Sequence, residues 1–387
     1  MRSIYLDYNA TTPLDPGVRA AMLPFLDEIY GNPSSIHHVG RRARALLDDA
    51  RDRVARVLGC RPSELVFTSG GTEACNLAVL GAARRLRERG RHIITSAVEH
   101  HAVLNACEYL ARREDFTLTC VPVNAEGIVE PDTVANILRP DTVLVSIMAA
   151  NNESGAKQPV AEIGALCRQR GVAFHTDAVQ VFGKESFASI HQFNADLVSV
   201  CGHKFHGPKG AGLLFVRSPF NLDPLLLGGG HENERRAGTE NLPAILGLTA
   251  AIERFIQEPV FPQERLWTLT AKVIARLDTL PGVTFRGSRD TRLSNTVAFT
   301  VEAADSITLL AALDLEGVCA SGGAACSAGS LQPSHVMLAM GVPPAAAKSL
   351  VRFSLGREST AEEIDTVLDL LPMLIKRSQE HSPVKSR

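Results

Sequence analysis

The chain has 387 residues, which is long enough for two lobes that each bury a hydrophobic core. Hydrophobic residues make up 45% and charged residues 21% of it, as in ordinary globular proteins. The formal net charge of -2 gives no electrostatic basis for binding nucleic acid or an anionic membrane, so neither is an expected partner. No apolar stretch approaches the roughly 20 residues that span a bilayer.

The eight cysteines are scattered along the chain, and no pair has the spacing Cys-x-x-Cys. A chain of this size does not need disulfides for its stability. The N-terminal residues reach the acidic Asp7 without forming the apolar core of a signal peptide. We therefore expect a cytoplasmic protein with free thiols.

The first half of the chain has the pattern of an α/β fold. Residues 40–58 carry apolar side chains at helical spacing, and Gly59 ends the pattern. Short β-rich runs then alternate with helical patterns. The expected strands are residues 65–68, 92–95, 142–147, 172–175, 196–200 and 210–216. Apolar strands separated by helices predict a mainly parallel sheet that is flanked by helices on both faces.

The pattern breaks near residue 258, in a segment with two prolines. A helix is expected from 266 to 277, followed by strands at 283–285 and 296–301. We therefore predict a large cofactor-binding domain over residues 13–257. A smaller α+β domain is predicted to combine residues 1–12 with residues 258–387.

Polar side chains follow several of the predicted strands. Ligands of open parallel sheets bind at the carboxyl ends of strands, so we expect these side chains to gather in one site. Residues 68–73 place two glycines and a threonine before a helical segment, where free N–H groups favour an anion. Alone this is a weak phosphate signal, since many helices begin with Gly-Thr merely as a cap. Other strand ends carry His100, Asn152, Asp177 and Gln180, each more often structural than catalytic when taken singly.

Residues 198–206 contain the most informative turn. A short apolar run ends in small residues, and the turn presents Lys204 between two histidines. A partly desolvated lysine at a strand end can lose a proton, as a lysine that bonds to an aldehyde must. A solvated loop lysine is the alternative, and this turn taken alone favours that alternative.

Together, the strand-end residues form the set that pyridoxal phosphate requires. This cofactor needs a lysine for its aldehyde, an acid beside its pyridine nitrogen and donors near its phenolic oxygen. It also needs an anion cradle and a flat group over the ring. The carboxylate matters most, because it keeps the pyridine nitrogen protonated and makes the ring an electron sink. Pyridoxal phosphate is therefore the predicted cofactor.

At this point the chain resembles a known family, the cysteine desulfurases of the NifS/IscS group. These are fold-type I pyridoxal-phosphate enzymes within the class V aminotransferases. The similarity runs almost from end to end. The matching motifs are residues 5–13, 31–37, 68–73, 150–153, 175–180, 201–204 and 351–357. The resemblance implies the fold-type I architecture, L-cysteine as substrate and a protein that accepts sulfur for iron-sulfur cluster assembly.

The resemblance also implies a role for each matching residue. Lys204 resembles the lysine that bonds to the cofactor, Asp177 the partner of the pyridine nitrogen, and His100 the ring-stacking histidine that helps to move protons. Arg352 lies where the family holds the substrate carboxylate, a task suited to a guanidinium. The other implied positions are Asn152 and Gln180 near the phenolic oxygen, with Asn152 also near the substrate, and Gly71, Thr72, Cys201 and His203 on the phosphate side. Thr239 resembles the threonine that reaches the phosphate of a neighbouring subunit, which implies a homodimer.

The segment 322–329 narrows the reaction class. It contains only small residues around Cys326, so it should be mobile and able to carry a thiol to a bound substrate. A loop cysteine without a task is an equally good reading of the composition alone. The resemblance to the family's catalytic segment makes Cys326 the expected nucleophile. It would attack the substrate sulfur after Lys204 removes the α-proton, giving a Cys326 persulfide and L-alanine.

Some positions depart from the family pattern. The segment around Cys326 lacks hydroxyl groups at 324 and 328, which reduces hydrogen-bond support for the thiolate. Cys201 stands where many relatives have serine, and a thiol is a poorer phosphate donor. Motifs at 201–204, 236–241 and 333–337 resemble the nitrogenase-associated NifS branch more than the housekeeping branch. No metal site is predicted, although Cys326 is a conceivable iron-sulfur ligand with Cys319.

Three alternatives remain open at this stage. An aminotransferase or carbon-sulfur lyase on the same scaffold would keep its activity without Cys326. A selenocysteine lyase would be separated by comparing rates on cysteine and selenocysteine. A non-catalytic scaffold for iron-sulfur assembly would show no visible absorbance from a bound cofactor.

Overall fold

The computed structural model describes residues 3–323 and 332–381 of the chain. Its strands are β1 (Ile4–Tyr5), β2 (Leu65–Thr68), β3 (His92–Ser96), β4 (Thr117–Val121), β5 (Thr142–Ser146), β6 (Ala173–Asp177), β7 (Leu197–Cys201), β8 (Gly212–Val216), β9 (Val283–Arg286), β10 (Thr296–Val301), β11 (Val318–Cys319) and β12 (Val351–Ser354). Its α-helices are α1 (Pro16–Met22), α2 (His38–Leu58), α3 (Gly71–Leu86), α4 (His101–Arg113), α5 (Pro131–Ile137), α6 (Val160–Gln169), α7 (Leu242–Phe255), α8 (Gln263–Leu277), α9 (Ser306–Leu315), α10 (His335–Ala339), α11 (Pro344–Ala347) and α12 (Ala361–His381).

Seven strands form the large sheet, in the order β2-β8-β7-β6-β5-β3-β4. Strand β8 runs antiparallel to β2 and β7, and the pairs from β7 to β4 are all parallel. The prediction of a mainly parallel sheet in an α/β fold is therefore confirmed. The sequence did not predict β4, whose threonines and partly exposed side chains are typical of an edge strand. Strand β6 also ends two residues later than expected, at Asp177.

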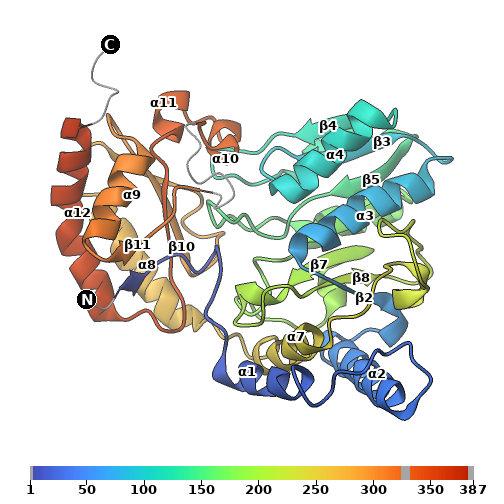
Figure 1. Cartoon of the computed structure of the whole chain (residues 1–387). Coiled ribbons are helices and arrows are strands. Elements are labelled where there is room, and N and C mark those ends of the chain that lie inside the picture. Colours follow the sequence, from blue (N-terminus) through green and yellow to red (C-terminus); the bar gives the residue numbers. More distant parts are fainter. Residues whose placement is uncertain (1–2, 324–331, 382–387) are drawn as a thin grey trace.

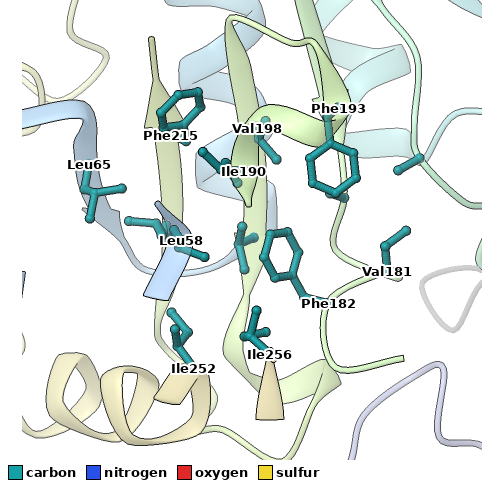
Figure 2. Close-up of a cluster of buried hydrophobic side chains, with 14 of the residues drawn as sticks. Leu58, Leu65, Val181, Phe182, Ile190, Phe193, Val198, Phe215, Ile252 and Ile256 are labelled. Atoms are coloured by element: carbon teal, nitrogen blue, oxygen red, sulfur yellow. The ribbon is translucent and has the colours of Figure 1, made fainter. Parts of the chain in front are cut away.

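Side chains of the large sheet alternate between two hydrophobic clusters, one on each face. On β2, Val66 packs in the cluster that includes α3 and α4, whereas Leu65 and Phe67 pack in the cluster that includes α2 and α7. Figure 2 shows part of the second cluster, in which Phe182 and Val198 lie among side chains from sheet and helices. Both faces are thus covered, which explains why the strands are apolar on both sides.

A second group of elements lies beside the large sheet (Figure 1). Strands β12, β10 and β9 form an antiparallel sheet in that order, and β1 pairs with β11. Helices α8, α9 and α12 share one hydrophobic cluster with this sheet. Leu6 and Tyr8 belong to the same cluster, although they are far from it in sequence. This packing supports our proposal that residues 1–12 belong to the small domain with residues 258–387, and residues 13–257 to the large one.

The remaining sequence expectations concern thiols and membranes. In the described ranges the seven cysteines are free thiols. Among the helices of the same ranges, none has both the length and the apolar character needed to cross a bilayer.

Candidate active site

A cavity of about 220 Å³ lies at the carboxyl ends of β5, β6 and β7. Ten of the residues singled out in the sequence line it, and they come from strands of the large sheet and the segments after them, from the start of α3 and from β12 of the small sheet. They are Gly71, Thr72, His100, Asn152, Asp177, Gln180, Cys201, His203, Lys204 and Arg352. The strand-end pattern predicted that Gly71, Thr72, His100, Asn152, Asp177, Gln180 and Lys204 would gather, whereas Arg352 was expected from the family resemblance alone.

Lys204 follows β7 in a short 3-10 turn, Gly202–Lys204, and borders the cavity. Its Nζ donates hydrogen bonds to the main-chain oxygens of Asn9, at 2.8 Å, and Ala10, at 2.9 Å. Burial lowers the pKa of this amine below its usual value, and Arg352 lowers it further, while Cys201 and Asp177 oppose the shift. The neutral, nucleophilic form of the amine is thus easier to reach than in an exposed lysine.

Asp177 is the last residue of β6, and its Oδ1 accepts a hydrogen bond from the Val179 N–H at 3.0 Å. His175 lies two residues earlier, between Ser146 Oγ at 2.7 Å and Ser199 Oγ at 3.0 Å. Burial lowers the pKa of His175 to about 3, so this imidazole is neutral and ties β5, β6 and β7 together. The carboxylate therefore stands on a rigid strand end.

His100 is the N-cap of α4, where its Nδ1 accepts a hydrogen bond from Ala102 N–H at 3.1 Å. An accepting Nδ1 places the proton of the neutral ring on Nε2. Burial lowers the pKa of His100, and the nearby Asp177 partly opposes this shift. His100 thus offers a flat, uncharged ring with one N–H group.

The amino terminus of α3 forms an anion cradle at the other end of the cavity. Its first N–H groups have no partners within the helix, and Thr72, the second residue of α3, lines the cavity. A Cβ atom at Gly71 would lie 3.0 Å from Val179 Cγ2, so a side chain there would crowd the cradle. Burial lowers the pKa of His203 to about 4, so His203 offers hydrogen bonds and no charge.

Cys201 lies at the same end, and it is buried. Its Sγ is 4.0 Å from Ala211 O, and burial raises the pKa of the thiol. A neutral, weakly donating thiol fits the expectation that this contact to a phosphate is weaker than the one a serine would make.

Arg352 enters the cavity from β12 of the small sheet and is almost completely buried. Its Nη2 lies 2.6 Å from Asp7 Oδ1, and its Nη1 donates to Asn152 O at 2.7 Å. These two contacts fix the plane of the guanidinium while its remaining N–H groups stay available. Such a group suits a carboxylate ligand.

Among the predicted site residues that the structure describes, Thr239 does not line this cavity. Thr239 lines a separate cavity of about 140 Å³, together with Arg236 and Glu240. Cys326 lies outside the described residues, so its role stays a prediction. In the described ranges, no three His, Cys, Asp or Glu side chains are grouped in a way that could hold a metal ion.

Sequence reasoning missed several side chains of the site. Asp7, Asn9 and Ala10 lie within the motif 5–13, which marked the resemblance but was given no role. Cys75 also lines the cavity from α3 and is buried. Only the N-terminal motif carried a signal that could have found its residues in advance.

The residues present fit pyridoxal phosphate. The α3 terminus with Gly71 and Thr72 suits a phosphate, Asp177 a protonated pyridine nitrogen, and Lys204 an aldehyde. The cavity wall between them carries the His100 ring and the Gln180 amide.

Comparison with known proteins agrees with this geometry. Residues 4–367 match the family described as aminotransferase class-V. A curated relative, cysteine desulfurase IscS of Dictyoglomus turgidum, is 44% identical over 385 residues, covering 99% of this chain and 97% of the relative. A solved NifS-like protein superposes with a TM-score of 0.89 at 36% identity, covering 97% of this chain and all of that one. A second solved chain, described as SspA in complex with cysteine, has a TM-score of 0.81 at 36% identity, covering 92% of this chain and all of that one. The chain belongs to the class-V aminotransferases, a family of pyridoxal-phosphate enzymes.

Proposed function

We propose that this protein is a cysteine desulfurase. It removes the sulfur of L-cysteine, gives L-alanine and holds the sulfur as a persulfide on Cys326. The observation that carries the proposal is the convergence of Lys204, Asp177, His100 and Arg352 on one cavity. Relatives named cysteine desulfurase match over almost the whole chain, and one solved relative was determined with cysteine, which supports the same reaction.

Bound pyridoxal phosphate supplies an electron sink for the α-carbon of the substrate. Asp177 would pair with a protonated pyridine nitrogen of the cofactor, and the N-terminus of α3 would hold its phosphate. Lys204 takes the α-proton, because burial lowers the pKa of its amine and so favours the neutral form that can act as a base. His100, with its proton on Nε2, is positioned to pass a proton to the product.

Arg352 holds the substrate carboxylate through N–H groups that Asp7 and Asn152 do not use. The same arginine also connects the cavity to the segment that carries the proposed nucleophile. Its main-chain N–H donates to Ser321 O at 2.6 Å, and Ser321 N–H donates back at 3.2 Å. Cys326 is five residues beyond Ser321, and five extended residues span at most about 18 Å. That length supports the reach required of Cys326.

A homodimer is the second part of the proposal. Leu26, Tyr30, Ile36 and Leu227 are large apolar side chains that lie exposed, Ile36 with 89% of its surface accessible. Ser34 Oγ lies 3.2 Å from His231 Nε2, which joins the two loops that carry most of these side chains. A second copy covering this face would also bring Thr239 toward the partner's cofactor phosphate.

The cellular compartment and the sulfur acceptor are also part of the proposal. The free thiols of the described ranges suit a reducing cytoplasm. The acceptor is proposed to be a protein of iron-sulfur cluster assembly, and the nitrogenase-associated branch stays a prediction.

The decisive experiment treats the cofactor-loaded protein with L-cysteine, measures alanine, and determines the mass of the peptide that contains Cys326. One added sulfur atom with alanine formation is expected. The variant Cys326→Ala should still bind cysteine but form no alanine. A variant that keeps its activity would point to a lyase or aminotransferase, and a protein without visible absorbance would point to a scaffold. Rates on selenocysteine compared with cysteine separate the selenocysteine lyase.

A further inference from the structure

Lys184 is a completely buried lysine beside the cavity. Its Nζ donates hydrogen bonds to Gln180 Oε1 at 2.6 Å and Asn9 Oδ1 at 2.7 Å, and lies 5.2 Å from the centre of the Phe261 ring. No ion pair of Lys184 occurs within the described ranges, and the adjacent Glu185 pairs with Lys157 instead. Burying an amine without a carboxylate is costly, so this lysine requires an explanation.

The contacts of Asn9 and Lys184 together decide how the amide of Gln180 is turned. The main-chain oxygen of Asn9 only accepts and Lys184 Nζ donates, so the atom of Gln180 that faces Lys184 is the oxygen. The Nε2 of Gln180 then donates to Asn9 O at 3.0 Å. A flipped amide would bring two donors together at Lys184 and two acceptors together at Asn9. The side chain of Gln180 therefore offers N–H, and not C=O, on the side that lines the cavity.

Asn9 is itself held in one orientation by Asn295 and Thr296 at the start of β10 and by Asn152 in the turn that follows β5. Its Oδ1 also accepts from Asn295 Nδ2 at 3.0 Å. Its Nδ2 donates to Thr296 Oγ1 at 2.8 Å and to Asn152 O at 3.2 Å. Lys184 thus rests on a fixed acceptor, and the main-chain oxygen of Asn9 receives both Gln180 and Lys204.

We propose that Lys184 is a positioning residue that locks the Gln180 amide so that the cavity carries an N–H donor at this point. The inference rests on the proposed function, in which the phenolic oxygen of the cofactor lies beside Gln180. A fixed donor stabilises that oxygen in its ionised form, whereas a rotating amide would present its own oxygen part of the time.

The first test is the pH midpoint of the visible absorbance of the cofactor-loaded protein. In Lys184→Met, a side chain of similar length without donors, the oxygen of the Gln180 amide loses its donor, and only the hydrogen bond to Asn9 O still opposes rotation of the amide. Loss of one hydrogen bond to an ionised oxygen should raise the midpoint by about 0.5 to 1 pH unit. Titration of released pyridoxal phosphate should also show weaker retention, by about threefold to fivefold.

A direct effect of the lysine charge would raise the midpoint as well, so a second background separates the two causes. In Gln180→Leu there is no amide to lock, and Lys184→Met should then add no further shift. A shift that persists in this background would overturn the inference. The other charged or titratable groups at the cavity remain in every variant, and they are Asp7, Cys75, His100, Asp177, Cys201, His203, Lys204 and Arg352.

The matched control is Lys157→Met, which removes a partly exposed lysine from the same neighbourhood and should leave the midpoint unchanged. If Lys184→Met does not fold, Lys184→Gln keeps N–H donors without a charge and should stay within about 0.3 unit of the parent protein. A larger shift in Lys184→Gln contradicts the inference. If the parent protein shows no absorbance with added cofactor, the proposed function fails instead, so the two failures are distinguishable.

Discussion

In two regions of the molecule a cationic side chain is shielded from solvent, and only one of these two regions is the candidate active site. Arg292, in the segment between β9 and β10, is 1% exposed, while Lys204 is only partly buried. Arg292 donates to Leu293 O at 3.0 Å and Thr270 Oγ1 at 3.1 Å, and its guanidinium lies 4.0 Å from the centre of the Trp267 ring. Lys204 borders a cavity where a carboxylate, a histidine and an anion cradle converge. A reactive site is therefore identified by several functional groups that meet around one cavity, and not by how deeply a cation is buried.

The two cations also differ in what burial does to their protons. Burial lowers the pKa of Arg292 to about 10, so it remains charged at neutral pH and acts as a fixed structural group. Burial also lowers the pKa of Lys204, and the usual pKa of a lysine is already lower than that of an arginine. The amine of Lys204 can therefore exist as a neutral base. The comparison therefore predicts opposite outcomes when each residue is replaced.

The largest effect is expected for Lys204→Ala. Alanine formation should fall by at least about a thousandfold, because the variant lacks both the cofactor linkage and the base. The visible absorbance of the bound cofactor should disappear in the same variant. Lys209→Ala, which alters an exposed lysine of the same loop, should retain both properties. Equal losses of alanine formation and of absorbance in Lys204→Ala and Lys209→Ala would contradict the special role of Lys204.

The second effect concerns Glu99, a fully buried acid next to His100. Its Oε1 accepts from Ser96 Oγ at 2.6 Å and Met148 N at 2.8 Å, and burial raises its pKa to about 8. A raised folded-state pKa stabilises the fold below the unfolded-state value and loses that contribution as pH rises through the folded-state value. The free energy of unfolding should therefore fall by about 3 kcal/mol between pH 5 and pH 8 because of Glu99.

Glu99→Gln mimics the protonated acid, so it should remove this part of the pH dependence. Urea unfolding of both proteins at several pH values measures the difference between their curves. If the free energies of unfolding of the two proteins change with pH in parallel, Glu99 is ionised in the folded protein. Arg292, by contrast, should contribute no pH dependence in this range.

A third and smaller effect is expected for Arg292→Met. The variant leaves several buried acceptors without a donor and should lose about 2 kcal/mol of unfolding free energy. The rate of alanine formation per folded molecule should stay within about twofold, since Arg292 is not part of the cavity. Arg289→Met, at an exposed ion pair with Asp278, should cost less than about 0.5 kcal/mol. A large loss of activity in Arg292→Met would place this region in the reaction.

The smallest effect is expected for Arg352→Lys. A lysine keeps the charge but not the two-pronged geometry, so kcat/KM for L-cysteine should fall about tenfold, mainly through KM. Arg357→Lys, which alters the arginine paired with Asp15, is the matched control and should leave KM unchanged. An unchanged KM in Arg352→Lys would indicate that the substrate carboxylate binds elsewhere.

Most of the fold was predictable because its core strands are apolar on both faces and its helices carry regular apolar faces. In the large sheet the exception is β4, which lies at the sheet edge, where the sequence pattern is weak. The short strands β1 and β11 and the strand β12 were not predicted either. The C-terminal part was harder to predict in detail because its sheet is completed by β12, far along the chain from β9 and β10. Hydrophobic pattern alone does not specify such distant pairing.

The site was predictable where residues follow a strand, as Asp177 and Lys204 do, because the topology itself brings strand ends together. The contacts of Asn9 were not predictable, since they depend on how residues 7–10 cross from the small sheet to the large one. Lys184 gave no sequence signal at all. Its effect on Gln180 follows only from hydrogen-bond directions in the folded protein.

The central claim is that Lys204 is the reactive amine of the cavity. Borohydride reduction of the cofactor-loaded protein, followed by peptide mass mapping, tests it most directly. The account predicts that the reduced pyridoxyl group is found on Lys204. Recovery of the group on Lys184 or Lys209, or on no lysine of this region, would contradict it.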